Sequence, residues 1–406
     1  MRNHRNTVVI GAGQAGLAAS WWLVNRGVDH VVLERGRVAE KWRSQRWDSF
    51  TLLSPNWQTR LPGHAYAGPD PNGFMSGAQT ATFLADYARS FAAPVFGGVT
   101  ATAVRPCGLG WALTTSAGPL TACNVIVATG ELGAPYVPPV TLPTSVPALH
   151  TSDYRNPDGL PPGAVLVVGA GPSGQQIARE LAAAGRRVHL AVGGHKTLPR
   201  RYRGHDTYWW MDRLGMLSRS VDTLPGGRPP RRSRNAVLAG GTWDLDVPSL
   251  AAQGVVVHGR LLDVHDGVAR FGDDLDATLA AADANADRFR ATVDAWVTAT
   301  GFAAPVEAPR PRGPVTEGPR ELDLGGIGAV VWATGFRRDY SWLSAPVLDA
   351  AGEPEHEHGI TAAPGLYFLG LRWQSRRSSS FLDGVAADAE HVTAHLAARS
   401  SFATAA

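Results

Sequence analysis

The chain has 406 residues, of which 44% are hydrophobic and 18% charged, and its formal net charge is only +3. This length allows about two to three domains with cores of their own, and so small an excess of positive charge gives no argument for a nucleic-acid partner. The two cysteines, Cys107 and Cys123, do not form a CxxC redox or metal motif. Because no apolar run approaches the ~18 residues of a membrane-spanning helix and the first strand leaves no room for a signal peptide before it, we expect a cytoplasmic protein.

The first predicted unit is a strand, a glycine turn and a helix near the N-terminus. Residues 8–16 read VVIGAGQAG, a short apolar run that ends in a GxGxxG pattern, and the following helix ends at Gly27. Such a turn lets the backbone approach a pyrophosphate, and the helix N-terminus offers it N–H groups. Glu34 ends the next strand, where a carboxylate can accept both ribose hydroxyls. The unit is therefore predicted to bind FAD or NAD. The residues expected to bind it are Gly11, Gly13, Gln14, Ala15, Gly16, Glu34 and Arg35.

The chain then passes through a loop, a helix and a linker. Residues 41–71 are loop-like and rich in aromatic side chains, and the pattern predicts a helix over 78–92. Short strands lead to NVIVATG at 124–130, and residues 133–163 are rich in proline and glycine, which is typical of a domain boundary.

A second unit of the same kind begins at Ala164. Its glycines stand at one constant offset of 158 from those of the first, and Val192 replaces the acid that ends the second strand. A carboxylate there would repel a 2′-phosphate, so its absence favours NADPH over NADH. Basic residues just downstream strengthen this prediction, although they also fit a solvated surface. The residues expected to bind NADPH are Gly169, Gly171, Pro172, Ser173, Gly174, Arg200 and Arg201.

The sequence ATGF occurs twice in the last third of the chain. The copy at 333–336 follows GAVVW, a buried-strand pattern, whereas the copy at 299–302 follows an Ala/Asp-rich stretch that is predicted as a helix. We expect the second copy to end a strand and the first to mark only a helix C-terminus. The histidines show no ligand spacing, so no metal site is predicted.

These motifs resemble the class B flavin-dependent monooxygenases. The resemblance rests on the two fingerprints, the ATG-ending strands at 128–130 and 333–335, and the stretch KWRSQRWDSFTLLSPNW at 41–57. It implies FAD at the first unit, with Trp42, Thr129 and Gly130 beside it, and NADPH at the second. It also implies that Asn56 faces the flavin near the oxygen chemistry. The family's linker motif survives only as His150 and Tyr154, and its GG pair before the tryptophan is Glu40 and Lys41 here, so the subclass stays open.

The expected fold is α/β, with two Rossmann-like dinucleotide-binding domains and a discontinuous FAD domain. Residues 1–155 and 323–406 are predicted to form the FAD domain, and residues 160–315 the NADPH domain. The expected function is an FAD- and NADPH-dependent monooxygenase that forms a C4a-(hydro)peroxyflavin and oxygenates a small organic substrate with O2. The alternatives are an NADPH-dependent reductase that passes electrons to a protein or quinone, and a binding protein without turnover. The oligomeric state stays open, with a homodimer as one alternative.

Overall fold

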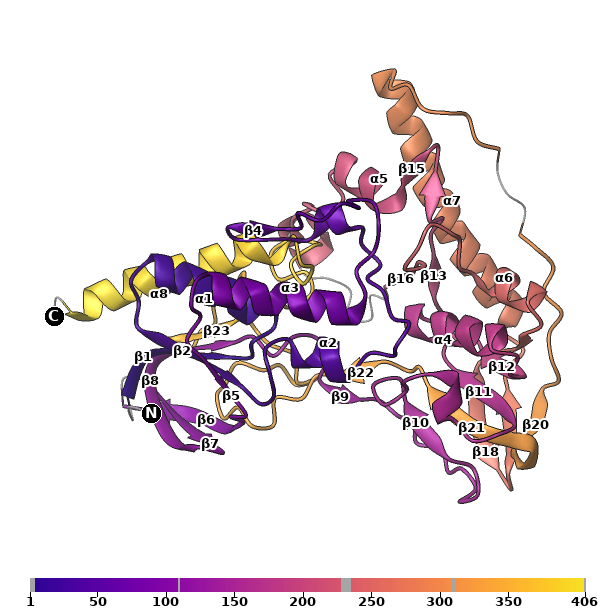
Figure 1. The fold of residues 1–406 in the computed structure, drawn as a ribbon, viewed down its shortest axis with the longest axis horizontal. Helices are drawn as coiled ribbons and strands as arrows, with labels where there is room; N and C mark the ends of the chain where they lie inside the picture. The colour runs from indigo at the N-terminus through magenta and orange to yellow at the C-terminus, as the bar shows by residue number, and fades with distance from the viewer. Residues whose placement is uncertain (1–3, 109, 228–234, 309–311, 405–406) are drawn as a thin grey trace.

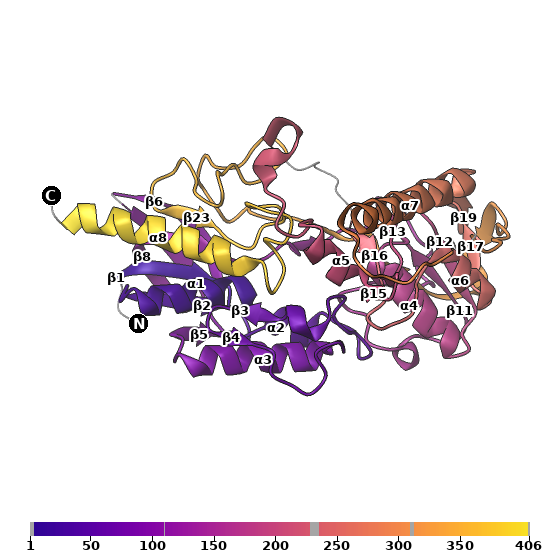
Figure 2. The same ribbon diagram turned by 90° about the horizontal axis from the view of Figure 1, so that it is seen from above.

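A computed structural model describes residues 4–108, 110–227, 235–308 and 312–404 (Figure 1). The chain forms two lobes, each built on a sheet with parallel strands and covered by helices, and Figure 2 shows the two lobes side by side. The predicted α/β fold with two Rossmann-like units is thereby confirmed.

The first sheet has the order β5-β2-β1-β8-β7-β6, and β23 also pairs with β8. The pairs among β5, β2, β1, β8 and β23 are parallel, whereas β6 and β7 extend the sheet as antiparallel strands. The last four residues of β1 and the first four of β2 are buried because both faces of the sheet are covered there. The bounds are β1 (His4–Ile10), β2 (His30–Glu34), β5 (Val95–Gly97), β6 (Ala101–Cys107), β7 (Gly110–Thr115), β8 (Gly118–Val127) and β23 (Leu366–Phe368).

Helices α1 (Gln14–Asn25), α3 (Gly77–Ser90) and α8 (Val385–Thr404) share one core with the first sheet. Helix α3 confirms the helix predicted over 78–92 and begins with a capping box between Ser76 and Gln79. Another core lies between the sheet and the loop around Tyr340. The short helix α2 (Glu40–Ser44) follows β2.

The second sheet has the order β10-β21-β11-β12-β17, and all its pairs are parallel. Helices α4 and α6 take part in one of its cores, and the three-stranded sheet β18-β19-β20 takes part in another. The bounds are β10 (Ala148–His150), β11 (Ala164–Val168), α4 (Pro172–Ala183), β12 (Val188–Ala191), α6 (Val247–Ala252), β17 (Val256–His258), β18 (Leu261–His265), β19 (Val268–Phe271), β20 (Glu321–Asp323) and β21 (Ile327–Trp332).

The predicted domain boundaries need correction at two strands. Strand β10 was expected in the first FAD-domain segment and β21 in the last, but both lie in the second sheet, with β21 between β10 and β11. The reason is that parallel strands pair across long stretches of chain, so a local apolar pattern does not state which sheet a strand joins. The second copy of ATGF does end a strand, as predicted, but a strand of the second lobe.

The first copy of ATGF lies at the C-terminus of helix α7 (Leu275–Thr300), where Gly301 adopts φ +65°, as predicted. Helix α5 (Thr207–Arg213) and α7 contribute Trp210 and Phe289 to one aromatic core. The remaining strands are short: β3 (Arg60–Leu61), β4 (His64–Ala65), β9 (Ala134–Pro135), β13 (Lys196–Thr197), β14 (Arg201–Tyr202), β15 (His205–Asp206), β16 (Ala236–Val237) and β22 (Phe336–Arg337). The 3₁₀ helices are Asn56–Gln58, Pro157–Gly159, Val221–Thr223, Pro225–Gly227 and Leu324–Gly326.

The chain leaves the first lobe and returns to it through one antiparallel pair. Strand β9 follows the first lobe's β8, strand β22 follows the second lobe's β21, and the two pair with each other. The backbone N–H of Tyr136 donates to the carbonyl oxygen of Gly335 at 2.9 Å, next to this pair. The outgoing and returning segments therefore lie side by side between the two sheets.

Candidate dinucleotide sites and the cavity between them

The two glycine turns have nearly the same geometry. Gly11 has φ +109° and Gly169 has φ +110°, a backbone conformation that side-chain-bearing residues rarely adopt. A Cβ atom on Gly11 would lie 2.6 Å from the carbonyl oxygen of Ala128, and one on Gly169 would lie 2.6 Å from that of Ala333. Each turn is thus packed against the ATG segment that ends the neighbouring strand.

The second and third glycines of each turn differ in what surrounds them. A Cβ on Gly16 would lie 1.8 Å from the carbonyl oxygen of Gly11, and one on Gly174 would lie 1.8 Å from that of Gly169, so both allow close packing of helix on strand. By contrast, a Cβ on Gly13 or on Gly171 would have no described atom within 4 Å. Open space over the second glycine is where a pyrophosphate approaches the backbone in such a turn, so both turns fit a dinucleotide.

The helix that follows each turn has no side-chain N-cap among the described residues. Gly13 is the N-cap of α1 and Gly171 that of α4, and neither offers a capping oxygen to the first N–H groups. Free N–H groups and the positive end of the helix dipole are favourable for a phosphate.

Glu34 is held in place at the carboxyl end of β2. Its Oε2 accepts from the backbone N–H of Ala12 at 2.8 Å, and its Oε1 accepts from that of Gly36 at 3.0 Å. Each carboxylate oxygen has a further lone pair, so the fixed side chain can still accept hydroxyl groups. At the matching end of β12, Val192 is fully buried and Gly193 and Gly194 follow it, so this position has no acid, as the sequence states.

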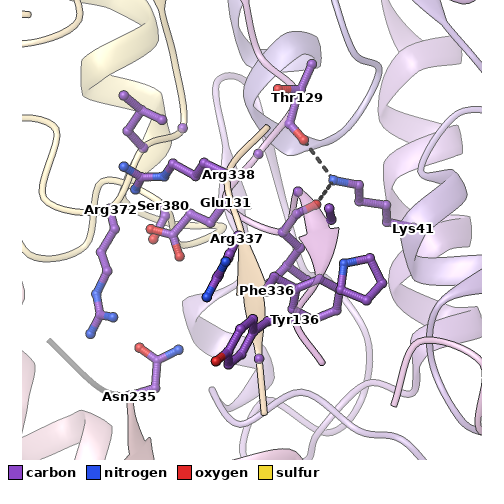
Figure 3. Close-up of a pocket in the computed structure, with 18 of the residues that line it drawn as sticks. Lys41, Thr129, Glu131, Tyr136, Asn235, Phe336, Arg337, Arg338, Arg372 and Ser380 are labelled. Carbon is purple, nitrogen blue, oxygen red and sulfur yellow. Dashed lines mark hydrogen bonds between the residues drawn. The ribbon is translucent and has the colours of Figure 1, made fainter. Parts of the chain in front are cut away.

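One cavity of about 2150 Å³ connects the two turns. Figure 3 shows part of its wall, where residues from both lobes lie near one another. The predicted residues that line it are Gly11, Gly13, Gln14, Ala15, Glu34, Arg35, Trp42, Thr129, Gly130, Gly169, Gly171, Pro172 and Ser173. Gly16 and Gly174 lie behind the wall, in the helix–strand contacts described above. The cavity thus reaches both turns that the sequence predicts as cofactor sites.

Asn56 does not line this cavity, contrary to the prediction from the sequence. Its side chain is 5% exposed, Nδ2 donates to the carbonyl oxygen of Asp70 and Oδ1 accepts from the backbone N–H of Met75, both at 2.9 Å. The amide therefore fixes the loop around it, and its polar atoms do not face the cavity. The family resemblance implied a flavin contact for Asn56, but its burial and hydrogen bonds give it a structural role instead.

Arg200 is likewise committed to the protein interior. Its side chain is 1% exposed, forms a salt bridge with Asp206 and donates from Nη1 to the carbonyl oxygen of Leu53 at 2.8 Å. Arg201 is exposed, donates to the carbonyl oxygen of Gly204 at 2.6 Å and does not line the cavity. The predicted phosphate contacts of both arginines are therefore corrected: one guanidinium is used for packing, and the other lies on the β14–β15 hairpin.

A different arginine lies at the carboxyl end of the second sheet. Ala191 and His258 are register partners in β12 and β17, so Gly193 and Arg260 continue beyond the strands at the same position. Both residues line the cavity, and the Arg260 side chain is 53% exposed, with a salt bridge of 3.5 Å to Asp274. The sequence prediction missed Arg260 because its position follows from strand pairing and not from proximity in the chain.

Lys41 is a second residue that sequence reasoning did not place in the site. Its Nζ donates to the carbonyl oxygens of Thr129, at 2.9 Å, and of Leu132, and it lines the cavity (Figure 3). Burial, followed by the positive charges of Arg35 and Arg46, lowers the pKa of Lys41 to about 8. Lys41 therefore ties the turn after β8 to helix α2.

A partly buried carboxyl group lies on that same turn. Glu131 lines the cavity, and Figure 3 shows its side chain between Ser380 and the β22 segment. Burial raises its pKa, although the charges of Arg372 and Arg338 and a hydrogen bond from Ser380 oppose the rise. Its Oε1 is buried and has no hydrogen-bond partner among the described residues.

Within the described ranges, no group of three or more His, Cys, Asp or Glu side chains is arranged to hold a metal ion. None of the helices described is both long and apolar enough to span a membrane.

Comparison with known proteins agrees with this geometry. The family model for the pyridine nucleotide-disulphide oxidoreductases matches residues 8–215. A CzcO-like oxidoreductase of Geobacillus kaustophilus is 33% identical over 97% of this chain and 98% of its own. A probable indole-3-pyruvate monooxygenase of Arabidopsis thaliana is 32% identical over 50% of each chain. A solved flavin-containing monooxygenase from Stenotrophomonas maltophilia shares the fold, with a TM-score of 0.67 at 21% identity over 98% of this chain and 99% of its own.

Proposed function

Because the chain belongs to the pyridine nucleotide-disulphide oxidoreductase family, and within it to the class B flavin-dependent monooxygenases, we propose that it is an FAD- and NADPH-dependent monooxygenase. It would transfer one atom of O2 to a small organic substrate. The observation that carries the proposal is that two matched dinucleotide turns open into one cavity. A bound FAD would accept hydride from NADPH and activate O2 at its C4a position.

The first turn suits the FAD. Gly13 leaves its backbone open to the diphosphate, the N-terminus of α1 offers free N–H groups, and Glu34 offers carboxylate oxygens to the adenosine ribose. Gln14 links this turn to the rest of the wall, since its Nε2 donates to the carbonyl oxygen of Ser380 at 3.4 Å. These residues bind and orient one end of the cofactor.

The second turn suits NADPH. Gly171 and the N-terminus of α4 repeat the open cradle, and no carboxylate stands at Val192 to repel a 2′-phosphate. Arg260 lies at the adjacent strand end, lines the cavity and is half exposed, so its guanidinium can bind that phosphate. We therefore assign coenzyme discrimination to Arg260, in place of Arg200 and Arg201.

The wall near Trp42 is largely aromatic, and the guanidinium of Arg46 lies over the rings of Trp42 and Phe50. The ring centroid of Phe50 lies 6.0 Å from that of Trp42 and 5.1 Å from that of Trp47. Leu52 also lines the cavity. Such a surface helps to exclude water from a reactive centre. Oxygen transfer requires this exclusion, because otherwise the reduced cofactor is reoxidised without forming product. Apolar side chains also provide the contact area for a small organic substrate.

The test measures where the oxygen atom goes. The full-length chain is supplied with FAD, NADPH and ¹⁸O2, and with an amine, a sulfide, a ketone or indole-3-pyruvate as the substrate. We expect one substrate to yield product that contains ¹⁸O and to lower H2O2 release per NADPH consumed. A matched control, Gly171→Ala, should abolish NADPH consumption while the flavin stays bound. Rapid NADPH consumption with stoichiometric H2O2 and no labelled product from any of them would instead favour the reductase alternative.

A further inference from the structure

The carboxyl edge of the first sheet presents its parallel strands in the order β5, β2, β1, β8 and β23. Ile10 of β1 and Phe368 of β23 are both register partners of Val127 in β8. Glu131 lies four residues beyond Val127, and Arg372 lies four residues beyond Phe368. The two side chains therefore follow neighbouring parallel strands, and both line the cavity.

This order can be compared with the order of groups in FAD, on the premise that the first turn binds it as proposed above. Glu34 ends β2, where the adenosine ribose would lie, and Gly13 follows β1, where the diphosphate would lie. The next group along an extended FAD is the ribityl chain, which carries free hydroxyl groups. The next strand end along the sheet is that of β8, which carries Glu131.

The chemistry of Glu131 indicates which group of FAD can form a hydrogen bond with it. A buried carboxylate oxygen without a partner is unfavourable, and it is satisfied only by a hydrogen-bond donor. Glu131 Oε1 is such an atom among the described residues. Phosphate oxygens and flavin carbonyl oxygens only accept hydrogen bonds, so neither can pair with this carboxylate oxygen. Ribityl hydroxyls donate.

Burial raises the pKa of Glu131, and the groups that oppose this rise leave Oε1 without a partner among the described residues. Arg372 and Arg338 supply positive charge, and Ser380 supplies a hydrogen bond, against the effect of burial. Lys41 holds both ends of the turn, since it donates to the carbonyl oxygens of Thr129 and Leu132 (Figure 3). We propose that Glu131 is a positioning residue for the flavin, whose Oε1 accepts a hydrogen bond from a ribityl hydroxyl.

The test compares ligands that contain or lack the ribityl chain. The full-length chain is freed of flavin, and the Kd values for FAD and for ADP are measured by flavin fluorescence and by calorimetry. Glu131→Ala should raise the Kd for FAD about tenfold or more, which is the effect of losing a hydrogen bond to a charged group. The same substitution should leave the Kd for ADP unchanged. Glu131→Gln, whose amide oxygen still accepts, should recover part of the affinity. Glu355→Ala removes an exposed carboxylate of the same cavity and should leave both values unchanged.

Three results would overturn this assignment. An unchanged Kd for FAD in Glu131→Ala would show that the carboxylate makes no such contact. An equal loss of FAD and ADP affinity would indicate a general effect on the fold. If N3-methylated FAD bound wild type and Glu131→Ala equally, the partner would be the ring N3–H and not the ribityl chain. A wild-type chain that binds ADP but no FAD would contradict the proposed function itself, which is a separate outcome.

Discussion

The Nζ atom of Lys41 donates a hydrogen bond of 2.9 Å to the carbonyl oxygen of Thr129, which joins helix α2 to the turn after β8. An ammonium group in this position is costly, because it is buried near Arg35 and Arg46. The lysine therefore stabilises the turn by its hydrogen bonds while its charge opposes folding.

Lys41 should make the stability of the protein depend on alkaline pH. Its pKa is about 8 in the folded chain and near 10.4 in an unfolded one, so between these values the unfolded state binds more protons and the free energy of unfolding rises with pH. Relative to Lys41→Met, the wild type should gain about 1–2 kcal/mol between pH 7.5 and 9.5. Urea unfolding of both proteins at the two pH values measures this, and parallel curves would contradict it.

The second and third glycines of the first turn should respond differently to the same substitution. Gly13→Ala places a methyl group in open space, so the free energy of unfolding should change by a few tenths of a kcal/mol while FAD binding falls strongly. Gly16→Ala places it 1.8 Å from the carbonyl oxygen of Gly11, so the fold itself should be destabilised. Thermal unfolding and flavin content separate the two effects. Loss of FAD without loss of stability in Gly16→Ala would contradict the packing role.

Arg260→Ala should change coenzyme preference. Loss of a charged hydrogen bond to the 2′-phosphate is expected to raise the KM for NADPH about 10- to 100-fold and to leave the KM for NADH unchanged. Arg201→Ala serves as a control, since Arg201 is exposed and outside the cavity wall. Steady-state NAD(P)H oxidation measures both. Equal changes in KM for the two coenzymes would show that Arg260 does not bind the 2′-phosphate.

A histidine pair in the second lobe should make the protein sensitive to acid. His189 Nδ1 lies 2.9 Å from His258 Nε2, and the Nδ1 of His258 lies 2.8 Å from the carbonyl oxygen of Pro319. Burial lowers the pKa of His258 as well, which favours the neutral form of the pair. Burial lowers the pKa of His189 to about 4, against about 6.5 unfolded. Its contribution to stability is therefore present above pH 6.5 and lost as the pH falls towards 4.

The measurement for this pair uses His189→Asn, whose amide can replace the Nδ1 donor without titrating. Relative to this variant, the wild type should lose about 1–2 kcal/mol between pH 6.5 and 4.5. Unfolding curves at both pH values give the difference. A variant that loses stability as steeply as the wild type would show that other groups control acid sensitivity.

The parts of the fold that the sequence predicted are those that depend on neighbouring residues. The glycine turns, helix α3 and the end of α7 at Gly301 follow from local spacing and capping, and the structure has them where they were expected. Strand β21 was assigned to the wrong lobe because its partner β11 is remote in the sequence. Local patterns specify that a strand exists, whereas pairing is decided by the whole fold.

The site shows the same division. Glu34 could be predicted because it ends a strand whose apolar pattern is plain in the sequence, and it lies at the cavity wall. The predicted phosphate contact of Arg200 was wrong because the sequence shows the charge of this residue but not its salt bridge with Asp206. Arg260 and Glu131 were missed because both owe their position to the register of parallel strands. Only three-dimensional structure identifies the neighbours of such residues.

The position of the last strands has a consequence for biosynthesis. Strand β21 lies between β10 and β11, and β23 pairs with β8, so each sheet is completed by a strand made more than 150 residues after its first. A ribosome releases the chain from the N-terminus onwards, and neither nucleotide-binding lobe can close before these strands emerge. Contacts so distant in sequence form slowly. Cofactor loading should therefore be a late, post-translational event, and chains truncated before residue 366 should retain no flavin.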